Sequence, residues 1–196
     1  MLQKLGFLLI VFLLANPMKS QELPYREIPD YPSDYGPGNI VSRMIDGLGF
    51  RFYWATEGLT EKDWSYKPSE ESRSVLETLQ HIYGMSEMIL NAPSATPNIR
   101  PTDFSKLTYS ELREKTLINL KAASKAMLGK QASDFEDFAV IFQRGEKQTP
   151  FPYWNLINGM LSDCIYHTGQ ITMLRRVTGN PINPSISVFT GKVQSN

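Results

Sequence analysis

"DCIYHTGQITMLRRVTGNP", residues 163–181, ends the longest helical pattern in the chain. Apolar spacing predicts a helix over residues 152–178, with proline in its first turn. The Gly-Asn-Pro that follows is a typical helix stop. Arg175 and Arg176 in the last turn suit the negative end of the helix dipole, and we expect both to cap this helix end and to stay in solvent.

Two polar residues interrupt the apolar stripe of this helix. Counted from Leu156 in steps of three or four residues, one face of the helix carries Met160, Asp163, His167, Gln170 or Ile171, and Leu174. Such a stripe faces the core, so we expect Asp163 and His167 on the core side. A buried carboxylate without a partner costs several kcal/mol, and Asp163 in that place requires a cation, a hydrogen-bond donor or water.

Three further helices are predicted before it. Two of them begin with a capping box, in which a Ser or Thr side chain and a Glu three residues later satisfy free backbone amides. These boxes are "SVLE" from Ser74 and "TYSE" from Thr108, whereas Asn39 is the expected N-cap of the first helix. The three predicted ranges are 40–57, 74–90 and 108–128.

The segment before the last helix carries a β signal. Residues 138–142 are largely apolar, and a polar turn at 144–147 follows, which predicts a short hairpin. Two connections between helices exceed about eight residues, the usual limit in simple bundles. The predicted fold is therefore all-α: a four-helix bundle with long crossover connections and a short β-hairpin before the last helix.

The N-terminus has the pattern of a secretory signal peptide over residues 1–20: Lys4, an apolar run over 5–14 and a more polar exit. The apolar run is shorter than the roughly 20 residues that cross a bilayer, so no membrane anchor is expected after cleavage. Residues 21–38 are rich in Pro and Tyr and predict an extended leader, and residues 39–196 form the helical domain. We therefore expect a secreted or periplasmic protein.

Charge and cysteine content narrow the function classes. The chain has 20 basic and 20 acidic residues, and removal of the signal peptide takes away Lys4 and Lys19, which leaves 18 against 20 and a net charge of −2. This balance argues against nucleic acid or an anionic membrane surface as a partner. Cys164 is the only cysteine, so the chain has no internal disulfide, and a lone thiol on an apolar helix is usually a small buried hydrophobe.

The two histidines of the chain, His81 and His167, each lie within a predicted amphipathic helix. Asp163 and His167 are four residues apart and therefore neighbours on one helix face, where both can bind one ion. Packing of the helices can add His81 and complete a face of two histidines and one carboxylate. The residues alone leave an alternative open, a plain Asp–His ion pair with hydrogen-bonded core histidines.

No catalytic residue can be assigned from the sequence. Ser162 and Cys164 flank the Asp–His pair, but no second base accompanies them, as a Ser–His or Cys–His nucleophile requires. The sequence has neither a Gly-rich phosphate loop after a strand nor paired-cysteine zinc spacing. The catalytic residues stay unknown at this stage.

Three segments resemble the DinB-like family, also described as DinB/YfiT-like metalloenzymes. They are "EGLTEKDWSYKP" (57–68), "SRSVLETLQHIYGMSE" (72–87) and the opening "DCIYHTGQITMLRRVTGNP" (163–181). The resemblance covers residues 39–183. It implies a four-helix bundle with a long crossover, often a homodimer.

The resemblance also implies a divalent metal between a histidine of the second helix and two histidines four residues apart on the fourth. Carried over by position, His81 and His167 match, and Asp163 stands where the family usually has a histidine. A carboxylate is a competent ligand, so the implied metal ligands are His81, Asp163 and His167, a set that suits zinc, nickel or iron. Better-characterised relatives include thiol-dependent transferases and isomerases, whose cytosolic thiols an exported chain would not readily meet.

The expected function is that of an exported, homodimeric DinB-like protein that binds a divalent metal and acts as a hydrolase or transferase on an unidentified small molecule. The alternative is a non-catalytic binding or scaffold protein that keeps the bundle without the chemistry.

Overall fold

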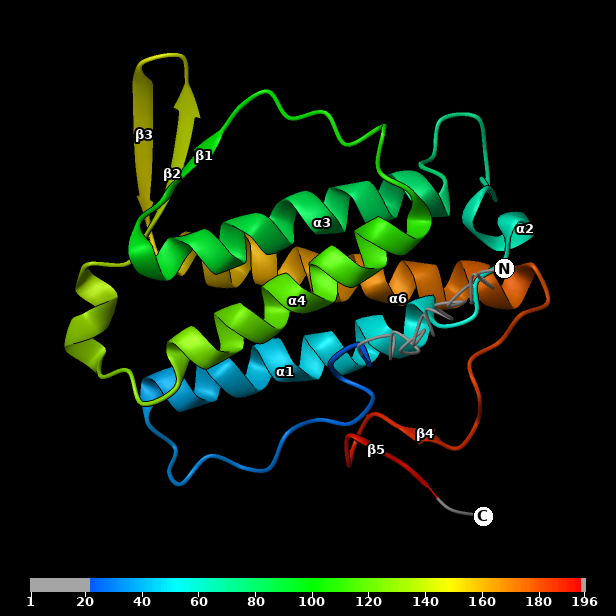
Figure 1. Ribbon diagram of the computed structural model, residues 1–196, viewed down its shortest axis with the longest axis horizontal. Helices are drawn as coiled ribbons and strands as arrows, with labels where there is room; N and C mark the ends of the chain where they lie inside the picture. Colours follow the sequence, from blue (N-terminus) through cyan, green and yellow to red (C-terminus); the bar gives the residue numbers. More distant parts are fainter. Residues whose placement is uncertain (1–21, 195–196) are drawn as a thin grey trace, which may run out of the picture.

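The computed structural model describes residues 22–194, and the predicted signal peptide lies outside them. The chain is mostly helical with a small sheet (Figure 1). The α-helices are α1 (Pro37–Thr56), α2 (Glu61–Trp64), α3 (Val75–Asn91), α4 (Tyr109–Met127), α5 (Trp154–Leu156) and α6 (Ser162–Val177). The strands are β1 (Pro97–Ile99), β2 (Ala139–Arg144), β3 (Lys147–Pro152), β4 (Ile186–Ser187) and β5 (Lys192–Val193), and short helical turns occupy η1 (Ala92–Ser94), η2 (Ala132–Glu136) and η3 (Ile157–Leu161).

Four long helical segments lie side by side (Figure 1): α1, α3, α4, and the continuous rod of α5, η3 and α6. Both α4 and α6 pack against α1 and α3, so the core lies between the two pairs. It is filled by fully buried large side chains from α1, α3 and α4, among them Ile45, Phe52, Leu79, Ile82, Leu117 and Leu120. Within the part of the chain that the structure describes, no helix is long and apolar enough to cross a membrane.

The two capping boxes are confirmed, and the predicted start of the first helix is wrong. Ser74 Oγ and Thr108 Oγ1 accept hydrogen bonds from the backbone amides of Glu77 and Glu111, respectively, and α3 and α4 begin directly after them. α1 begins earlier than expected, at Pro37, since proline suits a first helical position. Asn39 is therefore inside α1, and its side chain accepts from the Gly129 amide at 2.9 Å instead of capping its own helix.

The predicted hairpin is present as β2 and β3, which pair antiparallel from Ala139↔Pro152 to Arg144↔Lys147. A third strand, β1, which the sequence analysis did not predict, pairs parallel to β2 on its other side. β1 follows directly from the end of α3 through η1. This pairing fixes the start of the loop at residues 100–105, which returns along α3 towards α4.

The last long helix contains a π-helical turn, and this turn changes which residues face the core. Ile157–Leu161 is π-helical, and Ser162 Oγ donates to the Ile157 carbonyl five residues back, at 2.7 Å. A π turn holds one residue more than an α turn, so the buried stripe continues through Leu161, Cys164, Thr168, Ile171 and Arg175. The prediction that Asp163 and His167 face the core is therefore wrong: Asp163 is exposed and His167 is half-buried.

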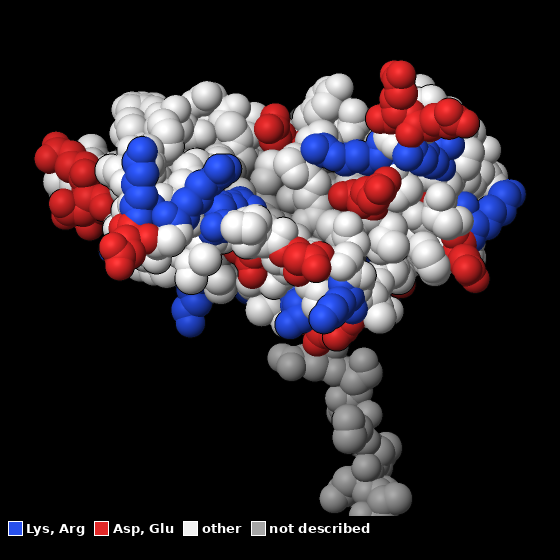
Figure 2. Space-filling model, turned by 90° about the horizontal axis from the view of Figure 1, so that it is seen from above, with Lys and Arg blue, Asp and Glu red and all other residues white. Residues whose placement is uncertain are grey.

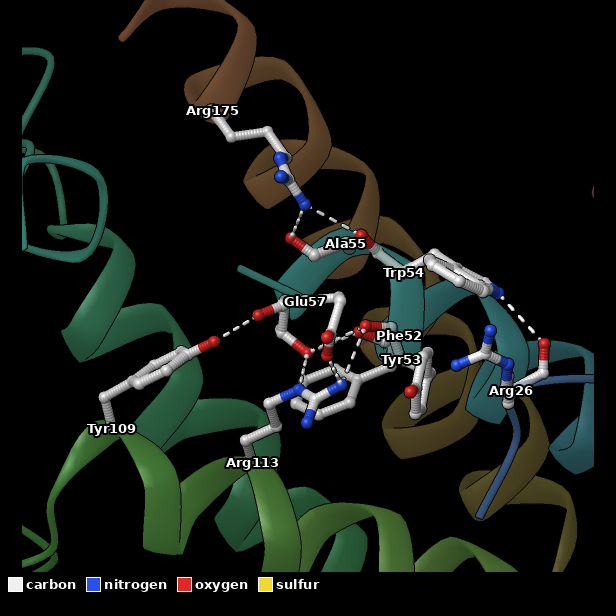
Figure 3. Close-up of polar contacts among 10 residues, drawn as sticks. Arg26, Phe52, Tyr53, Trp54, Ala55, Glu57, Tyr109, Arg113 and Arg175 are labelled. Atoms are coloured by element: carbon white, nitrogen blue, oxygen red, sulfur yellow. Dashed lines mark hydrogen bonds and ion pairs between the residues drawn. The ribbon is translucent and has the colours of Figure 1, made fainter. Parts of the chain in front are cut away.

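Arg175 of α6 caps the end of a different helix (Figure 3). Its Nη1 donates to the carbonyls of Trp54 and Ala55 in the last turn of α1, at 2.8 and 3.1 Å. Its Nε and Nη2 donate to the carbonyl and the side-chain oxygen of Asn180. Arg175 is 4% exposed, so the prediction that it stays in solvent is wrong, whereas Arg176 is exposed.

Helix α4 satisfies the remaining carbonyls of the same turn (Figure 3). Arg113 donates to the Tyr53 carbonyl at 3.5 Å, and the Tyr109 hydroxyl donates to the Thr56 carbonyl. Arg113 also forms an ion pair with Glu57. The last four carbonyls of a helix have no partner within the helix, and all four of α1 therefore receive donors from α4 or α6.

A buried carboxylate, Asp63 of α2, joins the segment after α1 to the segment after α6. It accepts hydrogen bonds from the Thr178 hydroxyl, from Asn180 Nδ2 at 2.8 Å, and from the amide and hydroxyl of Thr60 at 2.8 Å each. Burial favours the neutral acid, but these donors outweigh it and hold the pKa of Asp63 well below its usual range. Gly58, with φ of +67°, makes the turn that brings α2 to this place.

The segment at residues 22–36 lies over α1 and meets the C-terminal strands. The Tyr25 hydroxyl donates to Asp46 of α1 at 2.9 Å, and both side chains are buried. The Ile28 amide donates to the Gly191 carbonyl at 2.9 Å, beside the β4–β5 pair. This segment therefore covers α1 and the C-terminal strands together.

Arg175→Met is expected to lower the free energy of unfolding by about 3 kcal/mol, because it leaves buried carbonyls of α1 without donors. The matched control is the neighbouring exposed arginine: Arg176→Met should change stability by less than about 0.5 kcal/mol. Urea unfolding followed by circular dichroism measures both. Equal losses in the two variants would contradict the capping role of Arg175.

Asp63→Asn is expected to lower the free energy of unfolding at pH 7 by about 2–4 kcal/mol, because hydrogen bonds to a buried charge are lost. Since the folded pKa of Asp63 lies below its unfolded value, the wild type keeps this stability above about pH 4 and loses it as the pH falls further. The Asn variant should lose less stability over the acid range. Urea unfolding at several pH values tests this, with the exposed Asp137→Asn as control. Parallel pH profiles of wild type and Asp63→Asn would refute it.

Candidate metal site and adjoining pocket

The two histidines of the chain meet between α3 and α6. The ring centres of His81 and His167 are 4.9 Å apart, and the rings meet edge to face at 79°. Two imidazoles bound to one ion place their ring centres roughly 4.5–5.2 Å apart, because the metal–nitrogen bond is about 2.0–2.1 Å long. The spacing of the pair therefore fits two ligands of a single divalent ion.

His167 is oriented by the residue one turn beyond it. Its Nδ1 donates to Gln170 Oε1 at 2.7 Å, since an amide oxygen can only accept. This bond places the proton on Nδ1 and leaves the lone pair of Nε2 available. Metal-binding histidines are commonly held by a bond of this kind from the other ring nitrogen.

His81 is half-buried, and among residues 22–194 its ring nitrogens have no hydrogen-bond partner. Burial, followed by the charges of Arg73 and His167, lowers the pKa of His81, whereas Asp163 acts in the opposite sense. At neutral pH the ring is therefore the uncharged imidazole, the form that binds metals.

Asp163 lies one turn before His167 on α6, and its side chain is exposed. Its carboxylate has no hydrogen bond or ion pair within the described range of 22–194. Across that range no group of three or more His, Cys, Asp or Glu side chains is gathered closely enough to hold a metal ion. The structure thus brings together His81 and His167, and leaves Asp163 beside them but apart.

The neighbouring thiol has no part in such chemistry. Cys164 is fully buried on the core-facing side of α6, and burial strongly raises the pKa of its thiol. A thiol without access to solvent and with a raised pKa is not a nucleophile.

A pocket of about 350 Å³ adjoins the histidine pair, because His81 forms part of its wall. One side is α3 and the other is the loop at residues 100–105. The lining residues are Gln80, His81, Gly84, Met85, Met88, Arg100, Thr102, Asp103, Phe104 and Ser105. The sequence analysis missed the loop residues, since an aperiodic loop carries no spacing signal, and the parallel strand that positions it was not predicted.

Charges of both signs are mixed over the face seen in Figure 2. Groups of Lys and Arg side chains lie next to Asp and Glu side chains there, and neither sign covers the whole face. This distribution agrees with equal numbers of basic and acidic residues in the whole chain.

The fold and this site define a helical protein with two facing imidazoles, one of which lines a small pocket. A model of the DinB family matches residues 51–185, a range that includes His81, Asp163 and His167. The chain belongs to the DinB family. No curated protein and no solved structure matches it.

Gln170→Ala is expected to change the tautomer of His167, because the acceptor that holds the proton on Nδ1 is lost. Nitrogen-15 NMR at about pH 8, above the ordinary histidine pKa of about 6.5, should show an Nδ1–H form in the wild type and an Nε2–H form in the variant. Gln170→Glu keeps an acceptor and should keep the wild-type pattern. An unchanged His167 spectrum in Gln170→Ala would rule out this bond as the orienting contact.

Proposed function

We propose that this DinB-family chain is an exported divalent-metal-binding protein and a metal-dependent enzyme of the hydrolase or transferase type that acts on a small molecule. In this proposal His81, Asp163 and His167 are the ligands, and the four long helices form the four-helix bundle of the family, as a homodimer. Zinc, nickel and iron each suit two imidazoles and one carboxylate.

The observation that carries this proposal is the His81–His167 pair, with ring centres 4.9 Å apart beside a pocket. Gln170 orients one ring, and burial with Arg73 keeps the other uncharged. Two facing histidines with available lone pairs support a bound ion. A bound ion explains why both rings are there.

The position of Asp163 is compatible with a third ligand. Its carboxylate is exposed and has no partner in the described residues, so turning towards an ion would break no existing contact. The nearby cations of Arg73 and Arg100 also favour an added negative charge beside His81.

A divalent ion at this place supplies Lewis-acid polarisation and lowers the pKa of a bound water or thiol. The chain itself contributes three things. Gln170 fixes the direction of the His167 ring, burial keeps His81 deprotonated, and the pocket beside His81 holds a small molecule next to the pair.

A second candidate function is that of a non-catalytic binding protein. It is favoured by the exposed position of Asp163, which leaves two gathered ligands where a catalytic site usually has three. The two candidates differ in metal stoichiometry and in the contribution of Asp163.

Protein purified without a metal-affinity tag is expected to contain about one divalent ion per chain, and His81→Ala or His167→Ala should reduce this to near zero. Elemental analysis identifies the metal, and a thermal shift on adding zinc, nickel or iron to metal-free protein provides a second readout. Asp163→Ala should weaken binding by roughly 10–100-fold if the carboxylate is a ligand.

Asp137→Ala is the control, since this carboxylate is exposed and follows η2 at a distance from the pair in the sequence. It should leave the stoichiometry unchanged. The metal proposal would be refuted if the purified wild type contained no metal and showed no thermal shift when zinc, nickel or iron was added. Unaltered binding in Asp163→Ala would remove Asp163 from the ligand set and favour the binding protein.

A further inference from the structure

The pocket beside His81 contains a cation without a carboxylate partner. Among residues 22–194 no carboxylate lies within ion-pair distance of the Arg100 guanidinium. Asp103 also lines the pocket, but its carboxylate accepts from the Ser105 amide at 2.9 Å. A half-buried arginine without an ion-pair partner is a suitable place for an anionic ligand.

Arg100 is held in place by neutral contacts. Its Nη1 donates to Thr102 Oγ1 at 2.8 Å, its Nη2 contacts Met88 Sδ at 3.4 Å, and the guanidinium lies 5.8 Å from the centre of the Phe142 ring. Its backbone amide donates to the Gln143 carbonyl at 2.7 Å, next to the β1–β2 pairing. These contacts use only part of the five N–H donors, and the rest can hold a carboxylate in a forked geometry.

Part of the pocket wall is apolar. Met85 and Met88 are nearly fully buried on α3, and Phe104 packs edge-on against Tyr83 at 4.9 Å between ring centres. A Cβ at Gly84 would lie 2.8 Å from the Phe104 ring, so glycine allows this ring to pack directly on the helix. Thioether and aromatic surfaces of this kind accept the apolar part of a small molecule.

We propose that this pocket binds a small organic carboxylate, with its charge on Arg100, its apolar body on Met85, Met88 and Phe104, and its other end beside His81. The substrate class of the site is then an amphipathic organic acid. The role of this ligand as a substrate rests on the proposed function, whereas its binding by Arg100 does not depend on a metal.

The test compares two probes that differ in charge, 3-phenylpropionate and its neutral amide, on the metal-free full chain by ligand-observed NMR. The wild type should bind the carboxylate at least about tenfold more tightly than the amide, since charge-assisted bonds to a guanidinium are the stronger ones. This comparison needs no variant. Equal affinities, or no binding of either probe, would overturn the proposal.

Arg100→Gln should reduce carboxylate affinity to that of the amide, and the exposed Arg144→Gln on β2 should leave it within about twofold, as for a solvated charge. Equal losses in both variants would overturn the assignment to Arg100. Displacement of the probe by an equal concentration of inorganic phosphate would mean that the apolar wall contributes nothing, and would overturn the organic acid as the ligand class.

The outcome is separable from that of the metal experiment. If the chain binds no metal but discriminates the probes through Arg100, only the proposed metal function is lost. If the chain binds one metal and does not discriminate the probes, only the carboxylate proposal is lost.

Discussion

The end of α1 is the constraint on which the rest of the structure depends. Its last turn has no basic residue of its own, and four carbonyls there need donors in a place that water does not reach freely. Arg113 and Tyr109 of α4 and Arg175 of α6 provide them. One helix end therefore fixes the axial position of two neighbouring helices, and apolar packing alone, which is non-directional, would not do so.

The anchoring of α6 at the end of α1 also positions the histidines. Arg175 and His167 are eight residues apart on α6, so anchoring the arginine at α1 also sets the height of His167 relative to α3. The π turn at Ile157–Leu161 sets its rotation. Without the added residue, the stripe that begins at Leu156 would have placed His167 in the core. With the added residue, Cys164 and Thr168 are buried instead. His167 then lies at the edge of the core, in contact with His81. A half-exposed imidazole pair is accessible to an ion from solvent.

Local signals in the sequence predicted local structure well. The capping boxes at Ser74 and Thr108 and the hairpin at residues 139–152 depend on neighbouring residues only, and all three are confirmed. The π turn, the parallel strand β1 and the buried Arg175 depend on partners far away in the chain, which spacing along one helix does not contain. The pairing of His81 with His167 was predictable from composition and resemblance. The exposed side chain of Asp163 and the pocket at Arg100 were not predictable, because they too depend on distant parts of the chain.

Two of the segments that resemble the family have a structural role in this chain and do not contribute to the candidate metal site. "EGLTEKDW" supplies Asp63, and "TGNP" supplies Thr178 and Asn180, whose side chains meet in one buried network. Asn180 also receives Arg175, so this network and the capping of α1 are a single unit. The unit holds the fold without contact with His81 or His167. Asp163 lies outside this unit, on the exposed side of α6, and it forms no hydrogen bond or ion pair among residues 22–194, so the architecture that positions both histidines does not depend on it.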